Sequence, residues 1–236
     1  MAMKPIYSSY RQIQQFTADA AHELRTPLAA SQATVESALL MSELDEKEAR
    51  EILRTVERQN RRLTQLVADL LLLARMDSQA IADRPQLCCL NDLVSDLVEE
   101  LAALAIASEV ALTSSIRVQQ QLNVVGDADR LYRLVANLIV NAIQYTPAGG
   151  TVTVILDCSH QEAIVQVQDT GIGIAAADLE RIFDRFYRVN SDRSRNTGGS
   201  GLGLAIAQTI ARAHRGSLSA RSELGQGATF LLRLPL

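Results

Sequence analysis

The stretch from Tyr7 to Asp77 contains no glycine and only one interior proline, Pro27. It is rich in Ala, Leu, Gln, Glu and Arg, which have high helix propensity. After Met41 the segment SELDEKE interrupts the pattern, and Ser42 is the expected N-cap of the helix that follows. The stretch therefore predicts two helices joined as a hairpin.

The second arm of this hairpin carries apolar residues at alternating four- and three-residue steps, which is typical of a helix that packs along one face. The predicted seam consists of Ile52, Val56, Gln59, Leu63, Leu66, Leu70 and Leu73. A two-helix hairpin buries little apolar surface by itself, whereas two copies together make a four-helix bundle. We therefore expect a homodimer.

The helical pattern lapses in the segment DSQAIADRP, and we place a domain boundary there. Residues 1–80 then form a helical domain, and residues 81–236 form a second domain of mixed strands and helices. The expected strands are 86–90, 110–116, 122–125, 151–157, 163–169, 217–222 and 228–234. The expected helices are 91–108, 127–145 and 202–214, and Asn91 or Asp92 is the expected cap of the first of them. This order predicts an α+β chain in which a two-layer α/β sandwich follows the helical hairpin.

Composition narrows the classes of partner and compartment. The formal net charge is −4 with both signs interspersed, which argues against nucleic acid as a partner. Cys88, Cys89 and Cys158 are expected to be reduced packing thiols of a cytoplasmic protein. The longest apolar run, around residues 66–74, is far shorter than the ~20 residues that span a bilayer. We expect no membrane segment in this chain, which is compatible with a membrane-anchored full-length protein.

The segment HELRTP begins with His22, in the first predicted helix. The expected seam of this helix runs through Ile13, Thr17, Ala20, Leu24, Leu28 and Val35. His22 lies on the opposite side of the helix, so the spacing predicts an exposed imidazole. A metal site is disfavoured because HELRT lacks the second histidine of HExxH. Two interpretations stay open: a solvated surface histidine, or a nucleophile with Glu23 beside it and Thr26 one turn on.

Polar side chains that could hold a phosphate donor follow in the second domain. Asn137 and Asn141 lie four residues apart in NLIVNAIQYTP, on one face of the expected helix. Buried asparagines can simply satisfy backbone groups, but their carboxamide oxygens also suit Mg²⁺ bound to nucleotide phosphates. Asp169 ends a strand and precedes the glycines of DTGIGI, which indicates either a tight turn or a polar site.

A glycine-rich segment, GGSGLGLAI, leads into the last predicted helix. Its backbone N–H groups and the helix N-terminus can face an anion. A Rossmann fold is disfavoured because no parallel βαβ unit surrounds the glycines, and a P-loop is excluded because GxxxxGK[ST] is absent from the sequence.

Five motifs occur in the order HELRTP, NLIVNAIQYTP, DTGIGI, IFDRFYRV and GGSGLGLAI. In order and approximate spacing they resemble the H, N, G1, F and G2 boxes of two-component sensor histidine kinases, from about Tyr10 to Leu236. The resemblance implies the catalytic core of such a kinase. This core would be a HisKA-type dimerisation and phosphoacceptor domain followed by a GHKL-type ATP-binding domain with the Bergerat fold.

The resemblance implies that His22 accepts a phosphoryl group from ATP and passes it to an aspartate of a response regulator. Glu23 matches the acidic residue that assists this attack. Thr26 matches the position that is used, with the acidic residue, to dephosphorylate the regulator.

ATP and Mg²⁺ are the cofactors that the resemblance implies. Asn141 would coordinate Mg²⁺, Asn137 would support the phosphate site, and Asp169 would accept a hydrogen bond from the adenine amino group. The other implied nucleotide-binding residues are Tyr145, Gly171, Gly173, Gly199, Gly201 and Gly203, several of which would anchor a mobile lid that contains Phe183, Phe186 and Tyr187.

One position departs from the family pattern. Lys or Arg often follows the second asparagine of the N box by three residues, whereas this chain has Gln144. We therefore expect Arg188, with Arg185 behind it, to supply the cation that faces the γ-phosphate. His160 and His214 are expected at the surface.

Two other functions compete with the kinase interpretation. The related ATPases of chaperones, gyrases and mismatch-repair proteins share the nucleotide boxes, but they have no reason to carry HELRTP on a helical hairpin. A dimerisation module that does not bind nucleotide would not need the glycine boxes.

Overall fold

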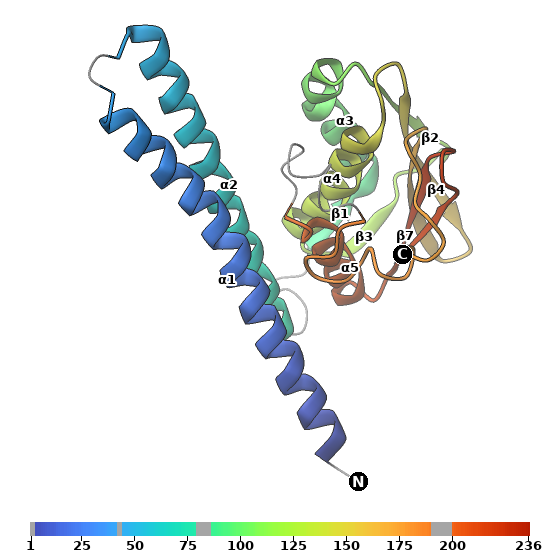
Figure 1. The fold of residues 1–236 in the computed structure, drawn as a ribbon. Coiled ribbons are helices and arrows are strands. Elements are labelled where there is room, and N and C mark those ends of the chain that lie inside the picture. Colours follow the sequence, from blue (N-terminus) through green and yellow to red (C-terminus); the bar gives the residue numbers. More distant parts are fainter. Residues whose placement is uncertain (1–2, 42–43, 79–85, 190–199) are drawn as a thin grey trace. The chain divides into compact units, whose positions relative to one another are not determined.

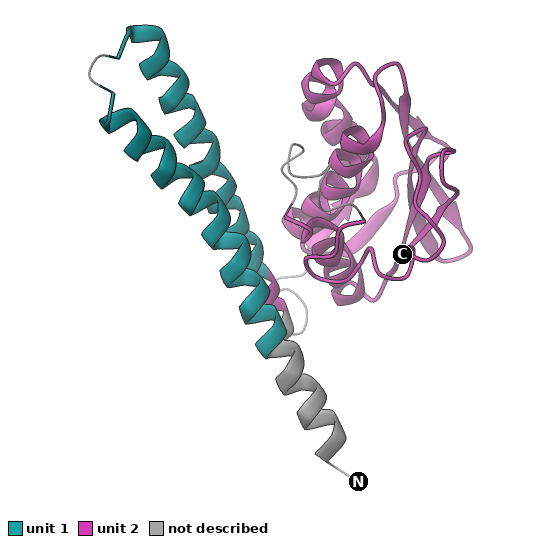
Figure 2. Ribbon diagram, viewed as in Figure 1, with its two compact units in different colours: residues 1–72 teal, residues 73–236 magenta. Residues whose placement is uncertain are grey.

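The computed structural model describes residues 3–41, 44–78, 86–189 and 200–236. These residues form two compact units, Met1–Leu72 and Leu73–Leu236 (Figure 2), and each unit is described by itself. The division between the units falls inside a helix. The predicted domain boundary between residues 80 and 81 lies outside the described residues and stays a prediction.

The first unit is a helical hairpin, as the sequence predicts (Figure 1). Its helices are α1 (Met3–Leu39), which continues through Pro27 without a break, and α2 (Glu46–Ser78). Asp45 caps α2: its Oδ1 accepts a hydrogen bond from N of Glu48 at 2.7 Å, and Oε2 of Glu48 accepts one from N of Asp45 at 3.1 Å. This reciprocal pair is a capping box. The cap is therefore Asp45 and not Ser42, which lies outside the described residues.

The two predicted seams of the hairpin have different outcomes. All seven seam residues of α2 are buried or half-buried, so that prediction is confirmed. Among the described side chains of α1, from residue 14 onward, Pro27 and Ser31 are buried, whereas Thr17 is exposed and Leu28 and Val35 are 51% and 42% exposed. The prediction for α1 is wrong at Thr17, Leu28 and Val35, because the face that packs within the unit lies to one side of the apolar stripe read from the sequence. The side chain of Ile13 lies outside the described residues.

The second unit is a two-layer α/β sandwich, and the α+β prediction is confirmed. Its five-stranded sheet has the order β2-β4-β5-β7-β6, in which only β2 and β4 are parallel. The strands are β2 (Ala111–Ile116), β4 (Thr151–Ser159), β5 (Glu162–Asp169), β6 (Ser217–Ser222) and β7 (Ala228–Pro235). The helices α3 (Leu90–Ala107), α4 (Ala128–Tyr145) and α5 (Gly203–Ala213) form the other layer (Figure 1).

The core of this unit lies between the sheet and the helices. Alternate residues of β4, β5 and β7 are buried, and α4 contributes one apolar face. This face consists of Leu131, Leu134, Val135, Leu138, Ile139, Ala142 and Ile143. Because α4 is anchored so firmly on the sheet, the polar residues on its other faces are held in place.

A two-stranded antiparallel sheet, β1 (Gln86–Cys89) with β3 (Asn123–Gly126), adjoins these helices. The residue before α3 is Cys89, which makes no side-chain cap, so the predicted cap at Asn91 or Asp92 is wrong. Oδ1 of Asn91 instead accepts a hydrogen bond from N of Leu122 at 2.9 Å. The asparagine thus ties α3 to the segment that enters β3.

The described helices include none that is both long enough and apolar enough to cross a membrane. All three cysteines are free thiols: Cys88 is buried, Cys89 is half-buried and Cys158 is exposed. Burial raises the pKa of the Cys88 thiol above its ordinary value.

Candidate functional site

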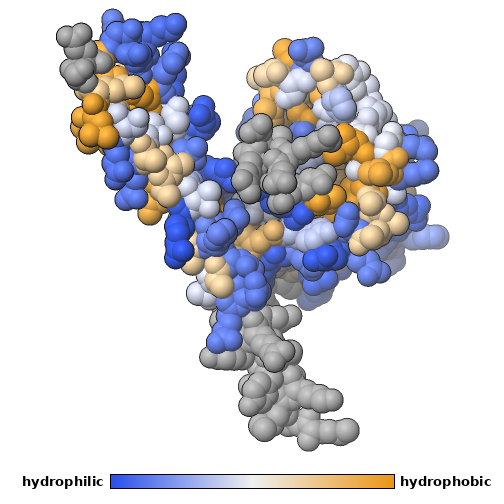
Figure 3. All heavy atoms as spheres, viewed as in Figure 1, coloured by the Kyte–Doolittle hydropathy of each residue, from blue (hydrophilic) through white to orange (hydrophobic). Residues whose placement is uncertain are grey.

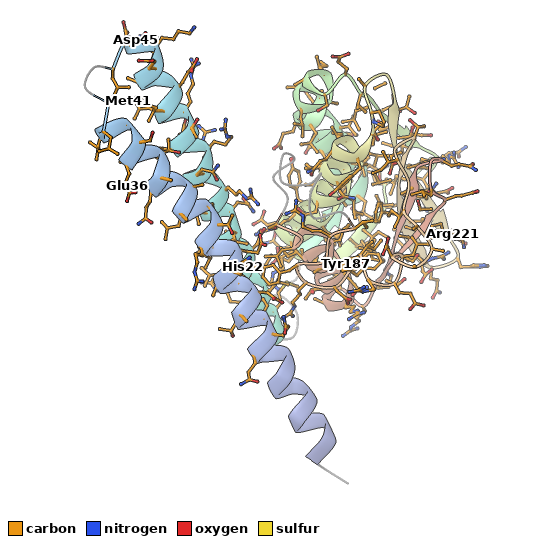
Figure 4. The ribbon with its side chains drawn as sticks, in the orientation of Figure 1. His22, Glu36, Met41, Asp45, Tyr187 and Arg221 are labelled. Atoms are coloured by element: carbon orange, nitrogen blue, oxygen red, sulfur yellow. The ribbon has the colours of Figure 1, made fainter. Side chains whose placement is uncertain are left out.

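The imidazole of His22 is exposed on α1, as the spacing predicts, and Glu23 beside it is half-buried (Figure 4). Oγ1 of Thr26 donates a hydrogen bond to the carbonyl oxygen of His22 at 3.2 Å. This bond fixes the hydroxyl one turn from the imidazole. Its oxygen keeps lone pairs that can accept a further hydrogen bond.

Asp169 is the buried carboxylate of the second unit. Its Oδ1 accepts hydrogen bonds from N of Gly171 at 2.8 Å and from N of Ala228 at 3.1 Å. Burial raises the pKa of this carboxyl, although the two backbone N–H groups oppose that shift. Because one oxygen is held by two donors, the side chain is fixed and Oδ2 stays available to a ligand.

The loop that follows Asp169 is held on both sides. N of Ile172 donates to the carbonyl oxygen of Tyr145 at 3.2 Å, and N of Gly225 donates to the carbonyl oxygen of Ile172 at 2.7 Å. Gly173 has φ +69, and a Cβ there would lie 2.1 Å from a carbonyl oxygen of the β6–β7 turn. Only glycine fits at this position. The DTGIGI loop is therefore fixed between the end of α4 and the β6–β7 turn.

The two predicted asparagines lie on α4. Nδ2 of Asn137 donates to the carbonyl oxygen of Gly203 at 3.2 Å, which joins the middle of α4 to the start of α5. Asn141 is half-exposed one turn further along α4. The N box and the G2 box are thus in direct contact, although 66 residues separate the bonded pair.

The F box meets the G2 box through the backbone. N of Phe186 donates to the carbonyl oxygen of Gly201 at 3.0 Å. Gly201 has φ +72, and a Cβ there would lie 2.8 Å from the Phe186 backbone. Phe186 itself has φ 63, a left-handed conformation that is rare for an aromatic residue.

Tyr187 of the F box forms a small polar cluster with two residues that precede the box. Tyr187 donates to Oδ1 of Asp178 at 2.6 Å, and the Arg181 guanidinium lies 4.3 Å from the Tyr187 ring centroid. Arg185 and Arg188 are half-buried, and both make contacts. Whether either faces a phosphate stays a prediction. Gly199 lies outside the described residues.

The structure thus joins three segments that carry predicted nucleotide-binding residues: α4 contacts the DTGIGI loop through Tyr145 and Ile172, and the start of α5 through Asn137 and Gly203. His22, Glu23 and Thr26 lie in the other unit. The sequence analysis missed Ala228, whose backbone holds Asp169 and which carries no side-chain signal. The two glycines of GQGATF, just before Ala228, are the sequence signal that could have predicted a close approach of the backbone to Asp169.

The prediction that His214 is a surface residue is wrong, since its side chain is only 8% exposed. Its position at the end of an amphipathic helix predicts a side chain that is exposed to solvent. The ring instead fills the space beside Gly126, which has no Cβ.

The residues present fit an adenine nucleotide. A buried carboxylate with one available oxygen suits an amino group, and the loops around Gly173 and Gly201 bring backbone close to the site. In the described part of the chain no three His, Cys, Asp or Glu residues gather to hold a metal ion. Any metal here would therefore take most of its ligands from the nucleotide and water, with Asn141 as a neutral oxygen donor.

The helical hairpin that carries the exposed His22 and the α/β sandwich each match a known family of domains. Residues 12–79 match the His Kinase A (phospho-acceptor) domain, and residues 126–236 match the histidine kinase-, DNA gyrase B- and HSP90-like ATPase domain. The chain belongs to the two-component sensor histidine kinases, and it carries their catalytic core.

Individual relatives agree with this assignment. The sensor histidine kinase RppB of Synechocystis sp. is 57% identical over 236 residues, which cover 100% of this chain and 52% of RppB. Full-length ShkA, solved in complex with AMPPNP, is 26% identical with a TM-score of 0.70 over 94% of this chain and 45% of ShkA. Histidine kinase ThkA, solved with the response regulator protein TrrA, is 19% identical and shows the same fold, with a TM-score of 0.74 over 100% of this chain and 67% of that one. The chain spans about half the length of RppB.

Proposed function

We propose that this chain is an ATP-dependent protein histidine kinase that phosphorylates His22 and passes the phosphoryl group to an aspartate of a response regulator. The observation that carries the proposal is the pairing, in one chain, of an exposed His22 on a hairpin with the buried Asp169 between glycine loops. ShkA, which shares the fold, was solved with AMPPNP.

The nucleotide would be held by the second unit. Oδ2 of Asp169 accepts a hydrogen bond from the adenine amino group, while the DTGIGI loop and the segment around Gly201 approach the rest of the nucleotide. Asn141 offers its carboxamide oxygen to Mg²⁺, which neutralises phosphate charge when bound. Asn137 keeps α5 in place through Gly203.

The chemical step forms a bond between an imidazole nitrogen of His22 and the γ-phosphorus. The bond from that phosphorus to the β,γ-bridging oxygen breaks, and ADP leaves. The carboxylate of Glu23 orients the ring and takes its proton. We further propose that Thr26, with Glu23, positions the water that attacks the aspartyl phosphate of the regulator, so that the bond to the aspartate breaks and inorganic phosphate leaves. ThkA was solved with TrrA, a response regulator protein, which supports a partner of this class.

We also propose that the working form is a homodimer. Beside the face that packs within the hairpin, both helices expose apolar side chains (Figure 3). These are Leu28, Val35 and Leu39 on α1, and Leu53, Val67 and Leu71 on α2, each between 42% and 79% exposed. In a four-helix bundle each helix packs against two neighbours, so it needs two adjacent apolar faces.

Light scattering of two matched variants tests the dimer. Val35→Glu places a charge in the exposed apolar face and should yield a monomer, whereas Ala33→Glu, on the opposite side of α1, should leave the dimer intact. A monomeric wild-type protein, or a dimeric Val35→Glu variant, contradicts the proposal.

Incubation with γ-labelled ATP tests the kinase activity. The wild-type protein should acquire label that is labile in acid and stable in alkali, and His22→Gln should acquire none. Label on His22→Gln would refute the assignment of the phosphoacceptor. ATP hydrolysis without any label would instead favour an ATPase of the chaperone and gyrase type. Transfer from the labelled protein to a panel of response regulators then identifies the partner.

A further inference from the structure

His214, the residue that follows α5, is one of the buried titratable side chains that the proposed reaction does not use. Its Nε2 accepts a hydrogen bond from N of Asp127 at 3.0 Å, and its Nδ1 lies 2.8 Å from the carbonyl oxygen of Ile210. Asp127 is the residue before α4. The ring therefore joins the end of one nucleotide helix to the start of the other.

The two partners fix the chemical form of the ring. A backbone N–H can only donate, so Nε2 must carry no proton. A carbonyl oxygen can only accept, so Nδ1 must carry one. His214 is thus a neutral imidazole in the Nδ1–H tautomer.

The start of α4 is held at this point by several bonds. Oδ1 of Asp127 accepts from N of Arg130 at 3.1 Å, and Oδ2 of Asp127 pairs with Nε of Arg130 at 2.9 Å. Gly126 allows the ring to approach, because a Cβ there would lie 2.3 Å from Cδ2 of His214. The position of the ring and the position of the α4 cap therefore depend on each other.

Helices α4 and α5 pack against each other (Figure 1), and polar contacts join them at two separated places. One is the bond from Asn137 to Gly203, and the other is the bond from Asp127 to His214. The contacts lie ten residues apart on α4 and eleven apart on α5, so the helices are antiparallel and held near both ends of α5. Two separated contacts set the distance between the helices and prevent one helix from sliding along the other.

We propose that His214 is a positioning residue for nucleotide binding. It holds α4 in register with α5, so that the asparagines of α4 and the glycines at the start of α5 meet in one site. This inference rests on the proposed nucleotide site, on which His214 acts through its bonds to Asp127 and Ile210.

Three substitutions separate positioning from bulk packing. His214→Gln keeps an acceptor that can reach N of Asp127, His214→Asn keeps only a short donor near Ile210, and His214→Leu keeps volume without polar atoms. The dissociation constant for Mg·ATP should rise about fivefold to tenfold in the Leu and Asn variants and stay within about twofold in the Gln variant. Equal affinity in all four folded proteins, or equal loss in Gln and Leu, overturns the proposal.

A double-mutant cycle with Gly126 gives an independent measurement. Gly126→Ala should weaken ATP binding in the wild-type background, because the new methyl group displaces a ring held by two hydrogen bonds. The same change in a His214→Ala background should add little, because the space is then empty. Additive effects overturn the coupling between the two residues.

Nitrogen NMR of the imidazole reports the tautomer directly, even in a variant series that binds poorly. A Nδ1–H signature for His214 supports the proposal, and a Nε2–H or doubly protonated ring contradicts it. If the wild-type protein binds no ATP, the proposed function fails. If it binds ATP and the His214 variants bind equally well, only this inference fails.

Discussion

Oδ1 of Asp169, the last residue of β5, accepts a hydrogen bond at 3.1 Å from N of Ala228, the first residue of β7. The two residues lie 59 positions apart in the chain. The neighbouring strands β5 and β7 bring them together. The same Oδ1 also accepts from N of Gly171. The carboxylate is therefore held at one oxygen by the backbone, and the other oxygen can serve recognition.

Replacement of Asp169 tests whether its Oδ2 recognises adenine while its Oδ1 is held by the backbone. In Asp169→Asn the amide oxygen can keep both backbone bonds, but the other position then carries an NH₂ group that faces the donor of adenine. We expect ATP affinity to fall about tenfold or more, because two donors then face each other. Calorimetry with ATP measures the change, and Gln226→Ala, an exposed neighbour in the β6–β7 turn, should bind normally. Unchanged affinity in Asp169→Asn would exclude the adenine role.

Because the pKa of Asp169 is raised in the folded protein, the stability of the second unit should depend on pH. The folded protein favours the protonated acid more than the unfolded chain does, because burial disfavours the charge. The protonated Asp169 carboxyl therefore contributes its full stabilisation below the ordinary carboxyl pKa. This contribution is lost as the pH rises through the raised pKa of Asp169 in the folded protein. Without ligand, Asp169→Asn should melt above wild type at neutral pH, and the difference should shrink on acidification. The exposed Glu223→Gln serves as the control, and a pH-independent difference would contradict the prediction.

The cation that faces the γ-phosphate is tested by a pair of substitutions. Arg188→Ala should depress autophosphorylation much more than Gln144→Ala, because only the arginine can neutralise phosphate charge. Initial rates with labelled ATP measure both variants, and Arg185→Ala should show a smaller loss than Arg188→Ala. Comparable rates for Arg188→Ala and Gln144→Ala would exclude this role for Arg188.

Arg215 follows the cap of α5 with φ 57, a left-handed conformation that costs about 1 kcal/mol for a residue with a Cβ. Arg215→Gly should therefore stabilise the second unit by about that amount and raise its melting temperature by roughly 2–4 °C. Arg212→Gly, inside the last turn of the same helix, should destabilise by about 1 kcal/mol. Thermal unfolding distinguishes the two, and a lower melting temperature for Arg215→Gly would show that its side chain makes a contact worth more than the strain.

Local sequence signals predict most elements of this fold to within a few residues. The helical hairpin, the seam of α2, Asp127 at the start of α4 and the period-two strands β4 and β5 all follow from patterns within one segment. One error, the cap of α2, occurs where local signals lie close together. The expectation that Ser42 caps α2 is wrong because Asp45, with Glu48 three residues later, has the capping-box spacing.

The tertiary structure decides what each buried polar group contacts. The hydrogen bonds from Asn137 to Gly203, from Ala228 to Asp169 and from Asp127 to His214 join segments that are distant in sequence. No periodicity within one segment can indicate them, because they depend on how the helices and strands stack.

By itself, the sequence determined that His22 faces away from the packed sides of its helix, because helical geometry fixes the direction of each side chain from its position alone. It also determined the order of the five motifs and hence the family. The burial of His214 against Gly126, and the backbone bonds that hold Asp169, were decided only by the tertiary structure. Burial and satisfaction of polar groups are properties of the whole packed unit, in which each group must find a partner from whichever segment lies nearest.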